Sequence, residues 1–159
     1  MITSNQSISN IYAFLKTIVA EQEYFHHSAV ENHFFRADID EQQGEFYEAL
    51  KNRVRYPAFV AESFGNTYTR LERGLFKERS MAFSIVEGTR EDNDYDELDD
   101  INDRVEPQGD NILRLLIEEC RNASCRIEID DIEATQIRNP QERYAGMRWS
   151  FTMRSFWYE

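Results

Sequence analysis

The sequence predicts an α+β domain, in which a curved, mixed or antiparallel sheet of four to five strands carries two or three helices packed on it. Three patterns predict this class. Apolar residues recur at helical spacing near the start of the chain and over residues 110–121, whereas residues 81–88 and 144–157 alternate with a period of two. The chain has 159 residues, which fits a single domain spanning 1–159, with a partly irregular N-terminal arm over about residues 1–44.

The first half of the chain predicts two helices and a linker between them. The first helix is expected from about Ser9 to Val19, because its apolar residues share one face. Residues 21–39 are rich in aromatic residues and histidine without a clean period, so we expect an irregular or extended linker. A second helix is expected over Glu45–Arg53. It should end before Tyr56-Pro57, because the residue before a proline is disfavoured in the α region.

The strands are predicted from turn residues and alternation. Pro57–Phe64 is expected as a strand, and Gly65-Asn66 as a turn. Thr67–Leu71 is consistent with either a hairpin strand or a loop. Met81–Gly88 has apolar or small residues on both faces, which favours a central strand covered on both sides.

Residues 87–110 are strongly acidic. They hold eleven acidic and two basic residues, so this segment carries 11 − 2 = 9 of the net charge of −12. Apolar residues within it still recur at helical spacing. Because a proline inside a helix costs about 3 kcal/mol, we expect two helical pieces with a break near Glu106-Pro107, and Asp110–Arg121 as the stronger piece.

The C-terminal part predicts two strands. Cys125–Glu133 alternates apolar and charged residues, and Asn139-Pro140 indicates a loop. Tyr144–Trp157 has the cleanest period of two in the chain, with Met147, Trp149, Phe151, Met153 and Trp157 on one face. Its other face carries Arg148 and Arg154.

Composition limits the classes of function. A net charge of −12 repels nucleic acid and anionic membrane surfaces and favours cationic partners. No stretch reaches the roughly 20 apolar residues of a membrane span, and the first ten residues lack a basic signal region, so we expect neither membrane nor secretory targeting. Cys120 and Cys125 have no second metal-ligating pair, which favours buried thiols in a reducing cytosol.

Three groups of residues resemble catalytic or metal-binding sites, but none matches a known motif. Asp92-x-Asp94-x-Asp96 resembles the opening of a calcium loop, but Glu97 occupies the position that requires glycine. His26 and His33 would share a helical face without a third ligand. Glu62, Glu87 and Glu128 could converge as nuclease carboxylates, although three strand acids are expected by chance in a chain with 30 acids. We therefore expect a non-enzymatic protein with no catalytic residue, no cofactor and no bound metal.

Two surfaces remain as candidate sites. The first is an acidic face that serves a lumen or a partner: Asp92, Asp94, Asp96, Glu97, Asp99, Asp100 and Asp103. The second is a candidate subunit interface: Arg148, Arg154, Trp157 and Tyr158. Opposite charges on two such surfaces would fix the register of an interface more than its affinity.

The order of these features resembles a known family. The segments on which the resemblance rests are Tyr56-Pro57-Ala58-Phe59-Val60, Ala82-Phe83-Ser84-Ile85-Val86, the acidic helix, and Ala145-Gly146-Met147-Arg148-Trp149-Ser150-Phe151-Thr152-Met153. Over about Leu50–Trp157 the chain resembles the small tail-terminator and head–tail completion proteins of tailed bacteriophages and prophages, including those of gut Bacteroidetes. The N-terminal arm and an insertion at 66–79 depart from the simplest members.

The resemblance implies a virion assembly protein. Such proteins form rings, often of six copies, that cap the tail tube and dock to the head connector. The expected partners are other copies of the chain and tail-tube or connector proteins, with DNA passing along an acidic wall without specific binding and with no membrane contact. The protein would occupy the host cytoplasm during assembly and then the virion or a phage-tail-like particle. The alternative is a monomeric acidic binding module, which mimics DNA or inhibits a basic protein.

Overall fold

The computed structural model describes residues 8–37, 55–72, 74–90, 94–122 and 127–158. In chain order these form α1 (Ile8–Glu21), the short 3-10 helix η1 (Glu23–Phe25), β1 (Phe34–Ala37), β2 (Ala58–Glu62), β3 (Gly65–Leu71), β4 (Gly74–Gly88), α3 (Tyr95–Asn122), β5 (Glu128–Asn139) and β6 (Tyr144–Tyr158). The predicted α+β class is confirmed, with six strands in place of the four or five expected.

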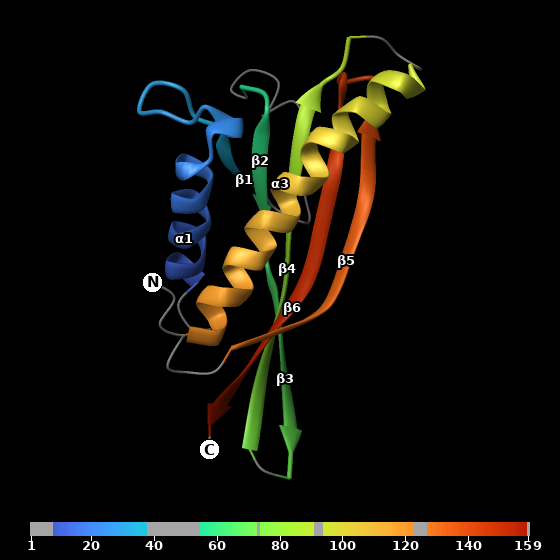
Figure 1. The fold of residues 1–159 in the computed structure, drawn as a ribbon. Helices are drawn as coiled ribbons and strands as arrows, with labels where there is room; N and C mark the ends of the chain where they lie inside the picture. Colours follow the sequence, from blue (N-terminus) through green and yellow to red (C-terminus); the bar gives the residue numbers. More distant parts are fainter. Residues whose placement is uncertain (1–7, 38–54, 73, 91–93, 123–126, 159) are drawn as a thin grey trace.

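The strands form one open, mixed sheet. Its order is β1-β2-β4-β6-β5, and β3 pairs with β4 beside this path. The long central strands β4 and β6 pair antiparallel over almost their whole length, and only β1 and β2 pair parallel. In Figure 1 the sheet runs the length of the molecule and twists strongly, as expected for strands of 15 residues.

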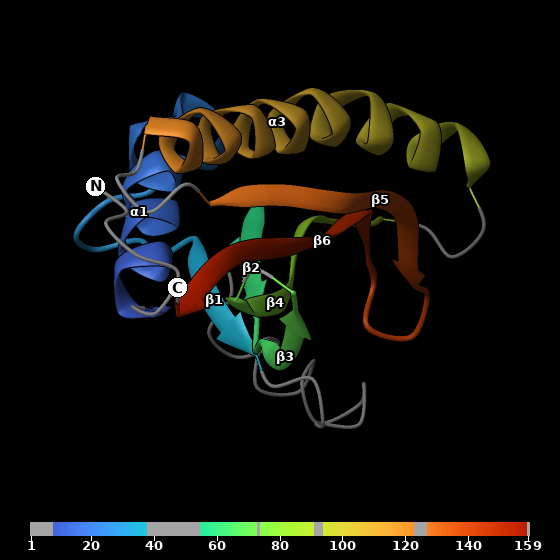
Figure 2. The ribbon, with the colours of Figure 1, turned by 90° about the horizontal axis from the view of Figure 1, so that it is seen from below.

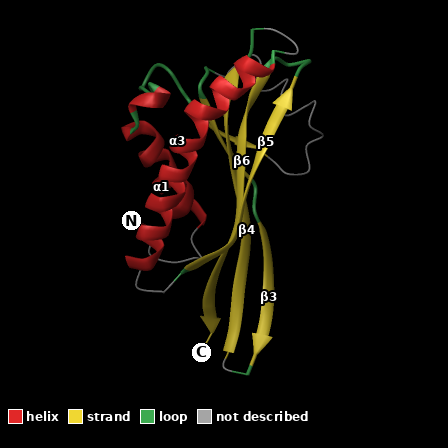
Figure 3. Cartoon of the chain, turned by 45° about the vertical axis from the view of Figure 1, so that its right-hand side comes forward, coloured by secondary structure: helices red, strands yellow, loops and turns green. Residues whose placement is uncertain are grey.

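β2 and β3 follow one another along the same edge of β4. Ala61 lies opposite Phe83 and Gly65 lies opposite Ser80, so four steps along one strand face three along β4. This one-residue mismatch is the geometry of a bulge, which increases the local twist. Beyond it, β3, the first half of β4 and the end of β6 leave the body of the domain as a three-stranded ribbon (Figures 1 and 3).

Both long helices cover one face of the sheet, and Figure 2 shows α3 lying above β5. The core between the layers contains a row of aromatic rings that crosses four strands. Neighbouring ring centroids are 5.4 Å apart for Phe34 and Phe59, 5.0 Å for Phe59 and Phe83, and 5.3 Å for Phe83 and Trp149. Such cross-strand pairs stabilise the sheet beyond their buried area.

The prediction of a helix break near Glu106-Pro107 is wrong. α3 runs without interruption over 28 residues and contains Pro107, which is exposed. Ile101, Val105 and Ile112, which lie on either side of Pro107, are all buried residues of this one helix. Burial of this continuous apolar stripe outweighs the roughly 3 kcal/mol that an interior proline costs.

The strands differ from expectation in three places. The strand β1 was not predicted within the linker 21–39, because it is short and pairs with a strand more than twenty residues away. The segment Thr67–Leu71, left open between strand and loop, is part of β3. The expected helix over 45–53 lies outside the described residues, as does Cys125 of the expected strand 125–133. β5 instead extends to Asn139, with an irregularity between Asp130 and Glu133.

Candidate functional site

The start of α3 uses part of the predicted acidic face for its own construction. The carboxylate of Asp94 accepts hydrogen bonds from the backbone N–H groups of Asp96 and Glu97, at 3.0 and 3.2 Å. This is the geometry of a helix N-cap. The Glu97 carboxylate in turn accepts from the backbone N–H of Arg90 at 2.9 Å. Asp94 and Glu97 therefore fix where the helix begins, and negative charge there is favoured by the helix dipole.

Four other acids of the predicted face, together with Glu106, form what we call the acidic ridge, a row of exposed carboxylates on α3: Asp96, Asp99, Asp100, Asp103 and Glu106. From Asp96 to Glu106 the row advances ten residues along the helix, or about 15 Å at 1.5 Å per residue. Among the described residues, no basic side chain is bonded to any ridge carboxylate. The ridge is thus a concentrated field of negative charge, with Arg104 of the same helix close enough to Asp100 to interact electrostatically. Asp92, the seventh residue of the predicted face, lies outside the described residues.

A hydrogen-bond network of Tyr24, Glu87 and Arg104 lies beside the ridge. The Tyr24 hydroxyl donates to Glu87 at 2.5 Å, and Arg104 of α3 donates two hydrogen bonds to the same carboxylate, at 3.2 and 2.7 Å. Burial first, and then the hydrogen bond to Glu87, raises the pKa of Tyr24 far above its usual range. The hydrogen bond to Glu87 likewise raises the pKa of Arg104. The network ties η1, the end of β4 and α3 together, and it borders a polar cavity of about 530 Å³.

The predicted interface arginines are engaged within the chain. Arg148 donates two hydrogen bonds to Glu62, at 2.7 and 2.8 Å. Arg154 bonds to Glu78 at 2.7 Å and to Asp130 at 3.0 Å. These pairs join β6 to β2, β4 and β5, and they were missed because their partners lie far away in sequence. The side chains of Trp157 and Tyr158 lie outside the description, so the predicted subunit interface stays a prediction.

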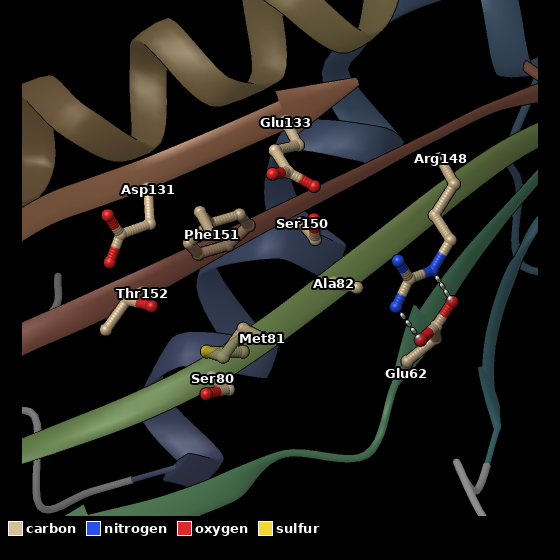
Figure 4. A pocket seen from close by; sticks show the side chains of 10 residues that line it. All are labelled: Glu62, Ser80, Met81, Ala82, Asp131, Glu133, Arg148, Ser150, Phe151 and Thr152. Atoms are coloured by element: carbon tan, nitrogen blue, oxygen red, sulfur yellow. Dashed lines mark hydrogen bonds and ion pairs between the residues drawn. The ribbon is translucent and has the colours of Figure 1, made fainter. Parts of the chain in front are cut away.

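The Glu62–Arg148 pair forms one wall of a groove on the sheet face that points away from the helices (Figure 4). The groove has a volume of about 300 Å³. Small residues of β4 and β6, such as Ala82 and Ser150, form its floor, and Asp131 and Glu133 of β5 lie at the opposite side. The arrangement offers ionic and hydrogen-bonding contacts to a surface ligand.

A third surface is the hairpin extension, which we define as β3, residues 74–80 of β4 and residues 152–158 of β6. It exposes large apolar side chains: Tyr68 is 49% exposed, Leu71 53% and Phe156 43%. The ring of Phe156 packs on Phe76 of β4 at 4.1 Å. In the sequence, this surface corresponds to the insertion at 66–79. Its turn residues did not decide between a strand and a loop.

The residues considered for metal binding do not converge. His26 ends η1 in the left-handed conformation, whereas His33 is buried and its Nδ1 lies 2.8 Å from the carbonyl oxygen of Pro57. Glu62 and Glu87 have separate basic partners, Arg148 and Arg104. Within the described ranges, no three His, Cys, Asp or Glu side chains are grouped to hold a metal ion. Neither described long helix is apolar enough over its length to cross a bilayer.

Comparison with known proteins adds no relative. No protein-family model matches the chain, and no curated protein matches it either.

Proposed function

We propose that the protein is a non-enzymatic, ring-forming assembly subunit of a phage or prophage tail, either a tail terminator or a head–tail joining protein. The observation that carries the proposal is the acidic ridge, which faces solvent along α3 and makes no ion pair or hydrogen bond to a basic side chain among the described residues. In a ring with this ridge on its inner wall, DNA phosphates are repelled from every side and pass without sticking. The resemblance over Leu50–Trp157 supplies the context.

The shape of the molecule supports this role. The ridge lies at one end of an elongated domain, and the hairpin extension lies at the other end (Figures 1 and 3). Residues 65–80 and 152–158, which include this extension, hold five basic and two acidic residues, a net charge of 5 − 2 = +3. Residues 87–110 carry −9. A chain with such different ends suits head-to-tail contacts, which close into rings when the rotation between copies allows it.

The lumen assignment is tested by reversing the charge of the ridge. Asp99→Lys, Asp103→Lys and Glu106→Lys lie beyond the first turn of α3, so they spare the charge–dipole contacts at its start. A ring of this variant should bind linear duplex DNA in a salt-dependent manner. It should not bind covalently closed circular DNA, which cannot thread a closed ring.

The matched control changes the net charge equally elsewhere, with Glu21→Lys, Glu23→Lys and Glu72→Lys, all of which are exposed. These positions lie outside the ridge, so this variant should treat linear and circular DNA alike. Equal binding of both DNA forms by the ridge variant would place the ridge on the outside of the ring and refute the lumen assignment.

A second candidate, the acidic binding module, is favoured by the spacing of the ridge. Its five carboxylates occupy about 15 Å, so their mean spacing along the axis is near 4 Å, close to the ~3.4 Å per phosphate of one DNA strand. A module of this kind would stay small in solution. It would bind a basic DNA-binding protein in a stoichiometric, salt-sensitive complex, and the ridge variant would lose that complex.

A further inference from the structure

β3 is an edge strand of the sheet, as are β1 and β5. It pairs with β4 on one side only, and six of its seven residues are exposed. The hairpin extension runs beyond both long helices, and in the described part of the chain no element lies against the outer side of β3 (Figures 1 and 3). An open edge presents a row of backbone donors and acceptors, which is a template for pairing with another strand.

The two outer strands of the sheet are protected against such pairing, and β3 is not. β5 carries four acidic residues and an irregularity between Asp130 and Glu133, and β1 has only four residues. β3 keeps an unbroken register with β4 from Gly65 to Leu71 and contains neither proline nor lysine. Its centre, Thr67-Tyr68-Thr69, consists of residues that favour strands. Of the three edge strands β1, β3 and β5, β3 is therefore the one best suited to pairing with another strand.

We propose that β3 pairs antiparallel with β3 of a second copy of the chain, about a two-fold axis that passes through Tyr68. Residues facing each other in an antiparallel pair lie on the same face of the sheet. In this register Tyr68 faces its own counterpart, Thr67 faces Thr69, Asn66 faces Arg70, and Gly65 faces Leu71. The two sheets become one, with the helices of both copies on the same side.

The facing residues are complementary in charge and in size. Arg70 meets Asn66, so the one charged residue of β3 does not meet its own copy. Facing threonines and facing aromatic rings are both favourable cross-strand pairs. Leu71 is 53% exposed and meets Gly65, where no atom lies within 4 Å of the position that a Cβ would take. The small residue thus leaves room for the large one.

Other registers use the edge less well. A two-fold axis through Arg70 would set two guanidinium groups against each other, which destabilises a strand pair. A shift of the partner strand toward β2 is limited by β1, which already occupies the outer edge of β2 as far as the pair Ala37–Glu62. The register through Tyr68 pairs all seven residues and ends at Gly65, three positions short of Glu62.

A two-fold contact of this kind is separate from the ring contacts proposed above and does not rest on them. Neighbours in one ring use head-to-tail surfaces, whereas isologous pairing joins the same surface of two copies. The pairing of β3 therefore yields a dimer of the free chain, or joins two rings through their extensions. In either case the number of copies in the particle is even.

Cross-linking tests the register. Tyr68→Cys, in a Cys125→Ser background, should cross-link rapidly to itself with a short thiol-reactive bifunctional reagent, because facing Cβ atoms lie about 5 Å apart. Thr69→Cys alone should cross-link poorly, and a mixture of Thr67→Cys and Thr69→Cys chains should cross-link well. Tyr95→Cys, at a residue 71% exposed on α3, gives the level expected from random collision. Cross-linking of Tyr68→Cys no better than this level overturns the proposal.

A mass measurement tests the contact without cysteines. Thr67→Lys with Thr69→Lys sets lysines against each other across the axis, and should halve the number of copies seen by sedimentation. Thr135→Lys, at an exposed position of β5, should leave the number unchanged. An unchanged mass for the double variant overturns the proposal. Whether the wild-type particle is a ring is read from its total number of copies, so the two proposals can fail independently.

Discussion

Replacing Gly109 by alanine should destabilise the protein, although the same change stabilises most helices. Glycine inside a helix costs about 1 kcal/mol relative to alanine. Gly109, however, lies against Trp149, and an added Cβ would be 2.1 Å from two atoms of the indole ring. Trp149 cannot move aside easily, because it is 1% exposed and stacks on Phe83. The methyl group must therefore displace a large, closely packed side chain.

The magnitude follows from three contributions. Overpacking of a core costs about 1–3 kcal/mol. The hydrogen bond from the Trp149 indole N–H to Asp110, at 3.2 Å, would be strained or lost, at a cost of roughly 1 kcal/mol. The gain in helix propensity returns about 1 kcal/mol. The expected net loss in the free energy of unfolding is about 1–3 kcal/mol.

Urea unfolding followed by circular dichroism measures this change as a shift of the midpoint. Pro107→Ala is the matched control, since Pro107 is exposed in the same helix, and it should gain up to about 3 kcal/mol. Combining Gly109→Ala with Trp149→Phe should cost less than the sum of the two, because the smaller ring leaves room for the methyl group. A Gly109→Ala protein as stable as the parent would refute the packing argument.

Three further predictions concern charged and titrating groups. Burial lowers the pKa of His27, so the unfolded chain binds more protons than the folded chain just below pH ~6.5. The free energy of unfolding should therefore fall as the pH drops below ~6.5, and His27→Gln should flatten this dependence in urea unfolding. Burial raises the pKa of Tyr24, so stability should fall as the pH rises above ~10, and ultraviolet titration of Tyr24→Phe should lose a tyrosine that ionises only on unfolding. Arg148→Met should lower the free energy of unfolding by roughly 1 kcal/mol, because it leaves the Glu62 carboxylate, 18% exposed, without its bidentate partner. If the double variant with Glu62→Gln loses the full sum of the two single losses, the two residues are not coupled and the prediction is wrong.

The elements with strong local periodicity were predicted correctly. α1 has a helical apolar face, and β6 alternates buried and partly exposed residues from Met147 onward, so local pattern was enough to predict both segments. The same holds for the β4 segment after Met81. The α+β class follows from these elements, because each has one apolar face that must be buried against another layer.

The features that depend on distant partners could not be predicted. Pro107 argues locally for a break in α3, and only the packing of the whole helix on the sheet overrides it. The four residues of β1 carry no period of their own, and their strand structure comes from pairing with β2. Five residues of the predicted acidic face lie on α3, and Asp94 precedes the helix as its cap. Which acids of this face cap the helix and which lie exposed along it could be seen only once the start and direction of α3 were known.

The ion pairs show the same limit. Arg148 and Arg154 were correctly placed on the polar face of the last strand, and from that position a contact with another copy was inferred. The sequence separation between Arg148 and Glu62 is 86 residues, so nothing local to either residue indicates that they meet. Sheet order, which brings β2, β4 and β6 side by side, is the missing information.

The measurement that tests the central claim most directly is the mass of the protein by light scattering, over a range of concentrations and salt, with electron micrographs of any large species. A ring-forming subunit should give closed rings of several copies, each with an open centre. A chain that stays a monomer or simple dimer under all conditions, including in the presence of tail tubes, would contradict the ring and favour the acidic binding module.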